Sequence, residues 1–304
     1  MALTTETAVA VRQNPARTAL LLFSSVRLGE VLVLQGSPLL GALFAMGRIT
    51  AAGCMAIAIL AAGSILLVAH VFVLNDWSGV DCDLRDPNRR HGVFPSRGIR
   101  RNGVAYLALA LLALGLLLLG TFGYRTLMIA AAIAGLSALY SFPRIHMKGV
   151  PVLSSALHFA GGLLHFLLGY SVFRTPDWRA IQIGSFFALV FVAGHLTHEI
   201  SDSDSDLANG IRTNAVTFGK MRSFLCAVLL FTTADVLLMA LALGGVVPGP
   251  LAAVVLICPL HVYWSVEAIR TGLTFEGIRR FRARYRALYA AAGLLMAAVV
   301  LLSK

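Results

Sequence analysis

Long apolar stretches separated by short polar segments dominate this chain. About 20 mostly apolar residues in an α-helix are enough to cross a bilayer, and nine stretches of this kind are present. Residues 121–125 and 244–250 are short connections that predict tight helical hairpins. We therefore expect an all-α integral membrane bundle of nine transmembrane helices, at residues 22–46, 50–74, 103–122, 124–141, 150–171, 180–198, 222–244, 248–268 and 285–303.

The composition supports a membrane protein and excludes several other classes. The chain of 304 residues is 58% hydrophobic and only 13% charged, with a mean hydropathy of +0.82. Soluble proteins carry about 25% charged residues, so this chain could not cover a soluble surface. Its four cysteines are scattered and form no Cys-x-x-Cys pair, which argues against a zinc site or a disulfide framework. We expect one integral membrane domain, residues 1–304.

The basic residues predict the orientation of the helices. Residues 1–17 lack the apolar run of a signal peptide and are expected to form a cytosolic tail. With that choice, twenty of the 25 lysines and arginines lie on the cytosolic side, as the positive-inside rule requires. The N-terminus and the loops after even-numbered helices should therefore face the cytosol from the cell inner membrane. The formal net charge of +11 then reflects topology and contacts with anionic lipid or substrate, and does not indicate nucleic acid.

The basic segment 272–284 can be interpreted in two ways. It could lie on anionic lipid as an amphipathic segment, or it could form part of a cap over a site inside the bundle. The density of its arginines favours the lipid surface.

Eight of the 14 acidic residues gather in two clusters, each following the cytosolic end of a predicted helix. The clusters lie within 75–86 and 198–206 and begin four helices apart, which indicates a weak internal repeat. Carboxylates at a helix end in a membrane protein are costly to desolvate, so such clusters imply compensating cations. Ordinary hydrated loops would instead interleave their acids with lysines.

The spacing within each cluster suits a divalent metal ion if the helices extend through the clusters. Residues three, four or seven apart share one helix face, and carboxylate and amide oxygens suit Mg²⁺, which often bridges to substrate phosphates. Asp81 would point away from that face, and a calcium loop is excluded because Leu207 stands where glycine is required. The candidate metal ligands are Asn75, Asp76, Asp83, Glu199, Asp202 and Asp206, with Asp81 as a further candidate, and the candidate catalytic residues are Asp76, Asp83, Asp202 and Asp206.

Basic residues follow both acidic clusters and the fourth predicted helix. Acid-bound Mg²⁺ with arginine and lysine donors is the combination needed to bind a diphosphate and neutralise it as a leaving group. Any single basic residue could equally serve topology or lipid contact. The candidate diphosphate ligands are Arg89, Arg90, Arg144, Lys148 and Arg212.

The two acidic clusters resemble the paired motifs of the UbiA superfamily of intramembrane prenyltransferases. Asn75, Asp76 and Asp83 match Asn-Asp-x-x-Asp-x-x-x-Asp, with Gly79 in place of the middle aspartate. In the second motif, Asp-x-x-x-Asp is matched by Asp202 and Asp206, with Glu199 in the leading acidic position.

Two further segments in the expected order extend this resemblance over the whole chain. The run 210–216 is similar to the family's Gly-Lys-Arg-Thr-Leu-x-Val. A second segment, Tyr140-Ser141-x-Pro143 with the following Arg144 and Lys148, is similar to the Tyr-Ser-x-Pro and following lysine of the family's chlorophyll-synthase-like branch. This resemblance adds Tyr140 to the candidate diphosphate ligands.

The resemblance implies a nine-helix bundle with a cytosolic cavity, capped by loops that carry the acidic motifs and two bound Mg²⁺ ions. A prenyl diphosphate donor would place its diphosphate at the metals and its tail in the apolar cavity, and an acceptor would capture the allylic cation. A dry cavity within the bilayer protects such a cation from water. We expect a Mg²⁺-dependent transferase that moves an isoprenoid chain to an aromatic or other nucleophilic acceptor.

Gly79 leaves two alternatives open. One is a UbiA-type terpene synthase, which cyclises the donor without an acceptor, and the other is a non-catalytic member that binds isoprenoid lipids. The missing ligand could come from Asp81 or Asp86 through a non-helical loop, or the site could use fewer protein ligands and more water.

Three polar residues inside predicted helices are candidates for the acceptor pocket: Glu30, His158 and Asp235. Each also has a structural interpretation. Glu30 could pair with Arg27 one turn earlier, His158 could be hydrogen-bonded in the core, and Asp235 could bond a neighbouring threonine.

Overall fold

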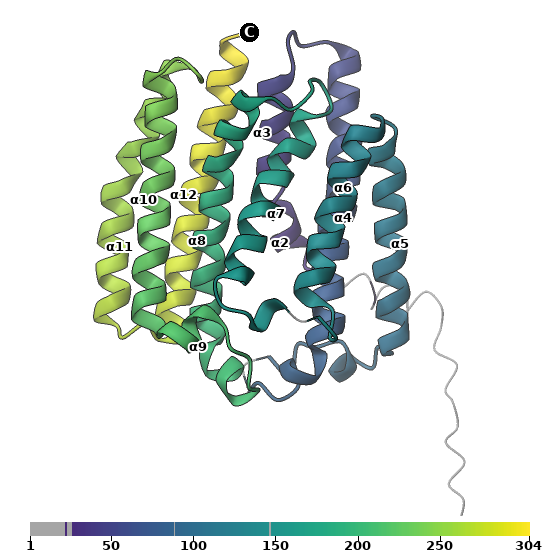
Figure 1. Cartoon of the computed structure of the whole chain (residues 1–304), viewed down its shortest axis with the longest axis vertical. Helices are drawn as coiled ribbons and strands as arrows, with labels where there is room; N and C mark the ends of the chain where they lie inside the picture. The colour runs from purple at the N-terminus through teal and green to yellow at the C-terminus, as the bar shows by residue number, and fades with distance from the viewer. Residues whose placement is uncertain (1–21, 23–25, 88, 146) are drawn as a thin grey trace, which may run out of the picture.

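Every regular element in the described part of the chain is helical, as the apolar pattern predicts (Figure 1). The computed structural model describes residue 22 and residues 26–87, 89–145 and 147–304. The predicted tail 1–17 and residues 23–25 of the predicted span 22–46 lie outside the described residues. The α-helices are α2 (Leu28–Val33), α3 (Gly36–Ala45), α4 (Ala51–Asp83), α5 (Arg101–Gly120), α6 (Tyr124–Ser141), α7 (Leu153–Tyr170), α8 (Trp178–Ala208), α9 (Asn214–Phe218), α10 (Lys220–Leu243), α11 (Cys258–Arg270) and α12 (Phe275–Leu302).

Seven helical segments among the described residues are long and apolar enough to cross a membrane. One combines α2 and α3, and another combines the 3₁₀ segment η3 (Gly249–Ile257) with α11. The other five are α4, α5, α8, α10 and α12. The remaining two predicted spans coincide with the 18-residue helices α6 and α7. The short connections between α5 and α6 and between α10 and η3 confirm the two predicted hairpins.

Two helices continue well beyond their predicted ends. Helix α4 has 33 residues and α8 has 31. At 1.5 Å per residue each exceeds the roughly 30 Å hydrocarbon core. The predicted spans ended where polar residues begin, but no proline interrupts α4 before Pro87, so its hydrogen bonding continues. The acidic clusters therefore lie on the last helical turns of α4 and α8, and not on cap loops as expected.

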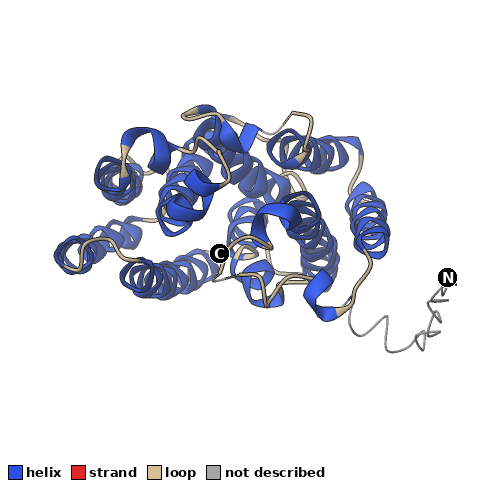
Figure 2. Cartoon of the chain, turned by 90° about the horizontal axis from the view of Figure 1, so that it is seen from below, coloured by secondary structure: helices blue, strands red, loops and turns tan. Residues whose placement is uncertain are grey.

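The two acidic helix ends lie at the same end of the bundle. In Figure 1 the chain after α4 and the short helix α9 after α8 meet at the lower end, opposite the C-terminus. Figure 2 shows the helices of the bundle end-on. This arrangement brings together segments that are more than 100 residues apart in the sequence.

Helices α3 and α7 pack backbone against backbone through glycines. A Cβ atom on Gly169 would lie 1.7 Å from the carbonyl oxygen of Pro38, and one on Gly41 would lie 2.1 Å from that of Phe166. No side chain fits at either position. Such close approach is typical of membrane helices. Lipid provides no hydrophobic driving force between helices, and small residues instead let the backbones come close enough for van der Waals packing.

Helix α12 begins ten residues before its predicted start. The Thr274 side chain accepts a hydrogen bond from the backbone N–H of Gly277, at 3.2 Å, which caps the helix. Ile278, Phe281 and Tyr285 then form a buried stripe with helical spacing. Residues 275–284 are thus the first turns of the last long helix, in place of the expected segment lying on the lipid surface.

Candidate active site

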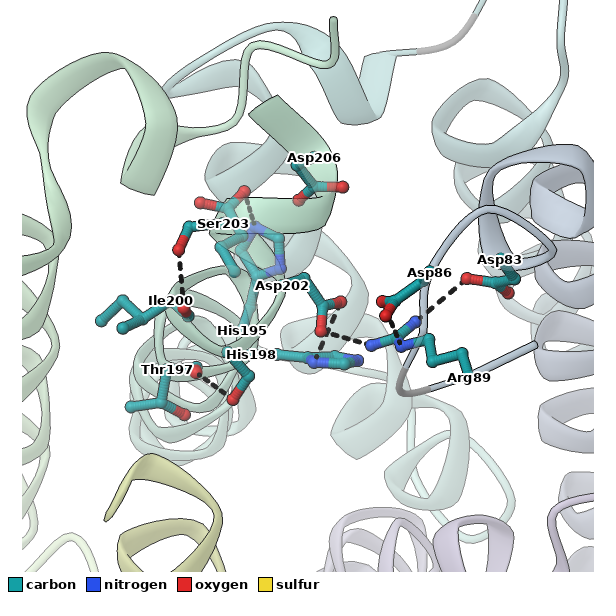
Figure 3. A network of polar contacts seen from close by, with 12 residues as sticks. Asp83, Asp86, Arg89, His195, Thr197, His198, Ile200, Asp202, Ser203 and Asp206 are labelled. Carbon is teal, nitrogen blue, oxygen red and sulfur yellow. Dashed lines mark hydrogen bonds and ion pairs between the residues drawn. The ribbon is translucent and has the colours of Figure 1, made fainter. Parts of the chain in front are cut away.

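Arg89, in the segment after α4, joins the two acidic motifs (Figure 3). Its Nη1 lies 3.3 Å from Oδ1 of Asp83, and its Nη2 donates a hydrogen bond to Oδ1 of Asp202 on α8. Its Nε lies 3.8 Å from Oδ2 of Asp86, whose side chain is also buried. Burial by itself lowers the pKa of the Arg89 guanidinium, but Asp202 and Asp83 outweigh burial and leave the pKa raised. Arg89 therefore stays cationic between the motifs.

The residues of the first motif point in two directions because α4 stays helical through them. Asp76 forms a bidentate ion pair with Arg27, whose Nη2 lies 2.5 Å from Oδ1 and whose Nε lies 3.1 Å from Oδ2 of the carboxylate. Asn75 accepts a hydrogen bond from the Ser141 hydroxyl at 3.4 Å. Asp81 faces away, with 67% of its side chain exposed, and pairs with Arg101 at 3.2 Å. Because α4 is helical here, the side chains of Asp81 and Asp83 point in different directions and have different partners.

Gly79 leaves open space beside Asp83. Among the described residues, a Cβ atom at this position would have only Oδ2 of Asp83 within 4 Å, at 3.9 Å. A side chain here would therefore point toward the site. Only the residue type at position 79 departs from the family pattern, because the backbone there leaves room for the side chain of the missing aspartate.

The second motif supplies two carboxylates to the same region. Asp202 contacts Arg89 and lies 3.5 Å from Nδ1 of His198. Asp206 accepts a hydrogen bond from Lys148 at 3.1 Å, while its Oδ2 is buried without a hydrogen-bond partner among the described residues. Asp206 therefore retains one acceptor oxygen that a cation could use.

Glu199 has a different set of partners from its neighbours in the motif. Its Oε2 accepts from the backbone N–H of Asn214 at 3.0 Å, and its Oε1 lies within bonding distance of Ser154 and of His195. The Asn214 side chain also donates to both carboxylate oxygens. Glu199 thus ties α7 and α8 to the start of α9. Sequence reasoning missed this role because a backbone N–H donor has no signature in the sequence.

The basic candidates for diphosphate binding divide into two groups. Arg89 and Lys148 contact motif carboxylates directly. Arg90 bonds to its exposed neighbour His91, and Arg144 and Arg212 are exposed. Tyr140 packs edge-on against His158, with 4.8 Å between the ring centroids. The structure thus brings Arg89 and Lys148 to the acidic motifs and leaves Arg90, Arg144 and Arg212 at the periphery.

The three acceptor-pocket candidates lie in separate surroundings. Glu30 pairs with Arg286 of α12 at 2.7 Å. His158 stacks on His195 with 3.6 Å between the ring centroids. Asp235 is fully buried and accepts hydrogen bonds from Tyr289 at 3.0 Å and from Cys258 at 3.3 Å. Asp235 thus joins α10, α11 and α12.

A cavity of about 320 Å³ opens beside Arg89 and Asp202. Its wall includes the first turns of α12, which sequence analysis had assigned to the lipid surface. The lining residues are Glu30, Arg89, Ser201, Asp202, Phe275, Arg279, Arg282, Ala283 and Arg286. The spacing of Arg279, Arg282 and Arg286, which predicts one helix face, was the signal that could have found this wall.

The donor atoms of the site suit Mg²⁺. Within the described residues, no three His, Cys, Asp or Glu side chains lie close enough to hold a metal ion by themselves. Mg²⁺, however, usually takes only one or two carboxylates and completes its shell with water and substrate phosphates. Asp83 on α4, and Asp202 and Asp206 on α8, could each supply carboxylate oxygens of this kind.

The chain matches the model of the UbiA prenyltransferase family over residues 36–289. It is 27% identical over 207 residues to digeranylgeranylglyceryl phosphate synthase of Natronomonas pharaonis, a match that covers 66% of this chain and 70% of that protein.

Solved structures share the fold. One, from work on digeranylgeranylglyceryl phosphate synthase in membranes, has a TM-score of 0.67 at 17% identity and covers 94% of this chain and 99% of its own. A UbiA homolog from Archaeoglobus fulgidus bound to GPP and Mg²⁺ has a TM-score of 0.66 at 16% identity, covering 92% and 100%. An apo UbiA homolog from Aeropyrum pernix K1 has a TM-score of 0.64 at 14% identity, covering 91% and 99%.

Proposed function

Because this chain belongs to the UbiA prenyltransferase family, we propose that it is a Mg²⁺-dependent enzyme transferring an isoprenoid chain from a prenyl diphosphate to a nucleophilic acceptor, aromatic or alcohol. The convergence of Asp83 and Asp202 on Arg89 carries this proposal. It places acidic and basic groups from both motifs in one region beside a cavity. The Archaeoglobus homolog with GPP and Mg²⁺ supports the same donor and metal.

Asp83 from the first motif, and Asp202 and Asp206 from the second, would each supply carboxylate oxygens to Mg²⁺, whose coordination water and substrate phosphates would complete. Lys148 and Arg89 would bind diphosphate oxygens. When bound, Mg²⁺ supplies positive charge that stabilises the diphosphate as a leaving group. Arg89 and Lys148 add charge-assisted hydrogen bonds to the same oxygens. Their present partners are the motif carboxylates, so both side chains are already directed into the region that the donor would enter.

The reaction needs a bond exchange at the first carbon of the isoprenoid. The carbon–oxygen bond to the diphosphate breaks, and its electron pair leaves with the diphosphate. The acceptor's nucleophilic atom then forms a bond to that carbon and loses its proton. The apolar helices of the bundle would shield the allylic cation from water, which would otherwise quench it.

We assign Glu199 to positioning rather than to the metal, because its oxygens already accept from Asn214 and lie near Ser154 and His195. Asn75 and Asp76 stay predicted ligands about two helical turns before Asp83. Asp76 would exchange Arg27 for metal or substrate. Asp81, paired with exposed Arg101, is the weakest candidate.

The same proposal extends to topology. All nine predicted spans, α6 and α7 included, would cross the bilayer as one domain. The acidic ends of α4 and α8 would face the cytosol from the inner membrane, where water-soluble Mg²⁺ and diphosphate are exchanged. The bias of lysine and arginine supports this orientation.

The test uses the purified chain in nanodiscs with geranyl, farnesyl and geranylgeranyl diphosphates, with Mg²⁺ or EDTA. Acceptors would be 4-hydroxybenzoate and, because of the similarity to the Natronomonas synthase, a prenyl glyceryl phosphate. Diphosphate release that requires both Mg²⁺ and an acceptor, with a prenylated product in mass spectra, supports the proposal. Release of cyclic hydrocarbon without acceptor would indicate a terpene synthase, and no release at all would indicate a binding protein.

Matched variants make the result specific. Asp202→Asn should abolish release. Asp204→Asn, two residues away, should leave release unchanged because Asp204 is exposed and pairs with Lys220 at 2.8 Å.

A further inference from the structure

The first turns of α12 present two faces of opposite character. Ile278, Phe281 and Tyr285 are buried, and Phe281 and Tyr285 pack against aromatic rings of α10. This packing fixes the rotation of the helix. Arg279, Arg282 and Arg286, spaced i, i+3 and i+7, consequently lie on the wall of the cavity that also holds Arg89 and Asp202.

The arginines of this wall differ in their partners. Arg286 pairs with Glu30 at 2.7 Å, and Arg279 lies 3.5 Å from the exposed Glu276. Arg282 makes no hydrogen bond or ion pair with any residue that the structure describes, and its Nε is buried without a partner. A buried donor without an acceptor is costly, and the cost is larger for a charged group.

The cavity as a whole has an excess of positive charge. Four arginines line it, against the carboxylates of Glu30 and Asp202. Asp202 is already engaged by Arg89 and Glu30 by Arg286. Arg280, the next residue after Arg279, is exposed and lies outside this cavity, so it offers a comparison within the same helix.

We propose that Arg282, flanked by Arg279 and Arg286, binds an anionic head group of the acceptor, a phosphate or a carboxylate. This inference rests on the proposed function, because it places the acceptor beside the donor site at Arg89 and Asp202. The fork of the guanidinium can bind either anion through paired N–H donors. Arg282 would thereby select acidic acceptors and orient their nucleophilic atom toward the donor.

The kinetic test compares Arg282→Gln with Arg280→Gln, an exposed arginine of the same helix. Matched probes are 4-hydroxybenzoate against its methyl ester, and a prenyl glyceryl phosphate against the dephosphorylated glyceryl ether. Arg282→Gln should raise the KM for the anionic acceptor that the enzyme uses by about tenfold or more, as expected for a lost charge-assisted hydrogen bond. The KM for the donor should stay within about twofold. An equal KM for charged and neutral acceptors in the unsubstituted enzyme would overturn the proposal.

A binding test separates this inference from turnover. Thermal unfolding is followed in phosphatidylcholine nanodiscs without donor or Mg²⁺ while inorganic phosphate is added. Phosphate should stabilise the unsubstituted chain, Arg280→Gln and Lys148→Gln, and should stabilise Arg282→Gln much less. Loss of the effect in Lys148→Gln alone would assign the anion to the donor site. A shift that appears only with phosphatidylglycerol in the disc would assign the arginines to lipid. Either result would overturn the proposal, whereas absence of any prenyl transfer with intact phosphate binding would count against the proposed function only.

Discussion

Arg89 and Asp202 lie 113 residues apart in the sequence and form an ion pair that connects the segment after α4 to α8. The same guanidinium reaches Asp83 at the end of α4, so one cation bridges both acidic motifs. Their junction at Arg89 therefore defines where the donor's charged end should bind.

Replacement of Arg89 by glutamine should reduce kcat/KM for the donor by about tenfold to a hundredfold, because charge-assisted hydrogen bonds are lost. Steady-state diphosphate release measures the effect. Arg90→Gln is the matched control, since the Arg90 side chain is exposed and bonds to exposed His91. Equal effects of the two substitutions would remove Arg89 from the donor site.

Gly79→Asp should complete the first motif. A Cβ atom at Gly79 is in van der Waals contact with Oδ2 of Asp83 alone among the described residues, so the backbone leaves room for a side chain to begin there. We expect the half-saturating Mg²⁺ concentration for diphosphate release to fall about tenfold, equivalent to about 1.4 kcal/mol. Without Mg²⁺ the new i, i+4 pair of like charges should slightly lower the unfolding midpoint. Gly79→Ala is the control, and an unchanged Mg²⁺ requirement in Gly79→Asp would show that this helix face does not meet the metal.

Glu199→Gln distinguishes positioning from metal binding. The glutamine amide would present a donor to Asn214, which is itself a donor, inside a buried network. The free energy of unfolding should fall by about 1–3 kcal/mol. The Mg²⁺ concentration for half-maximal activity should be unchanged. A raised Mg²⁺ requirement with an unaltered unfolding midpoint would make Glu199 a metal ligand instead.

Gly169→Ala tests the close approach of α3 and α7. Its Cβ would overlap the carbonyl oxygen of Pro38, so the helices must separate. We expect a loss of about 1–3 kcal/mol or more in the free energy of unfolding. Gly135→Ala in α6 should instead be neutral or stabilise the helix by about 0.5–1 kcal/mol. Apart from the backbone of its own helix turns, no atom of the described residues lies within 4 Å of the new methyl group. Thermal unfolding in nanodiscs would compare the two, and equal behaviour would contradict this packing.

The apolar pattern predicts the positions of the helices well but not how far some of them extend. Hydropathy drops at Asn75 and His198, yet hydrogen bonding in α4 and α8 continues to Asp83 and Ala208. A helix continues as long as no helix-breaking residue such as proline interrupts it. A predicted membrane span, in contrast, ends where the residues stop being apolar. Because α4 stays helical, Asp81 and Asp83 point in different directions.

Side-chain direction limits what the sequence predicts about the site. Arg89 and Arg90 are adjacent and chemically identical, and only the fold makes one central and the other peripheral. The arginines of α12 suggested a lipid surface because basic density does not reveal which way a helix face points. The burial of Ile278 and Phe281 decides that direction, and it depends on packing against other helices.

Equilibrium binding of farnesyl thiodiphosphate, an unreactive donor analogue, tests most directly whether the two motifs form one site. Binding is measured in nanodiscs as a function of Mg²⁺ for the unsubstituted chain, Asp83→Asn, Asp202→Asn and Asp204→Asn. Asp83→Asn and Asp202→Asn should each remove the Mg²⁺-dependent part of the affinity, while Asp204→Asn should bind as the unsubstituted chain does. Unchanged Mg²⁺-dependent binding in Asp83→Asn or in Asp202→Asn would contradict a single site shared by the two motifs.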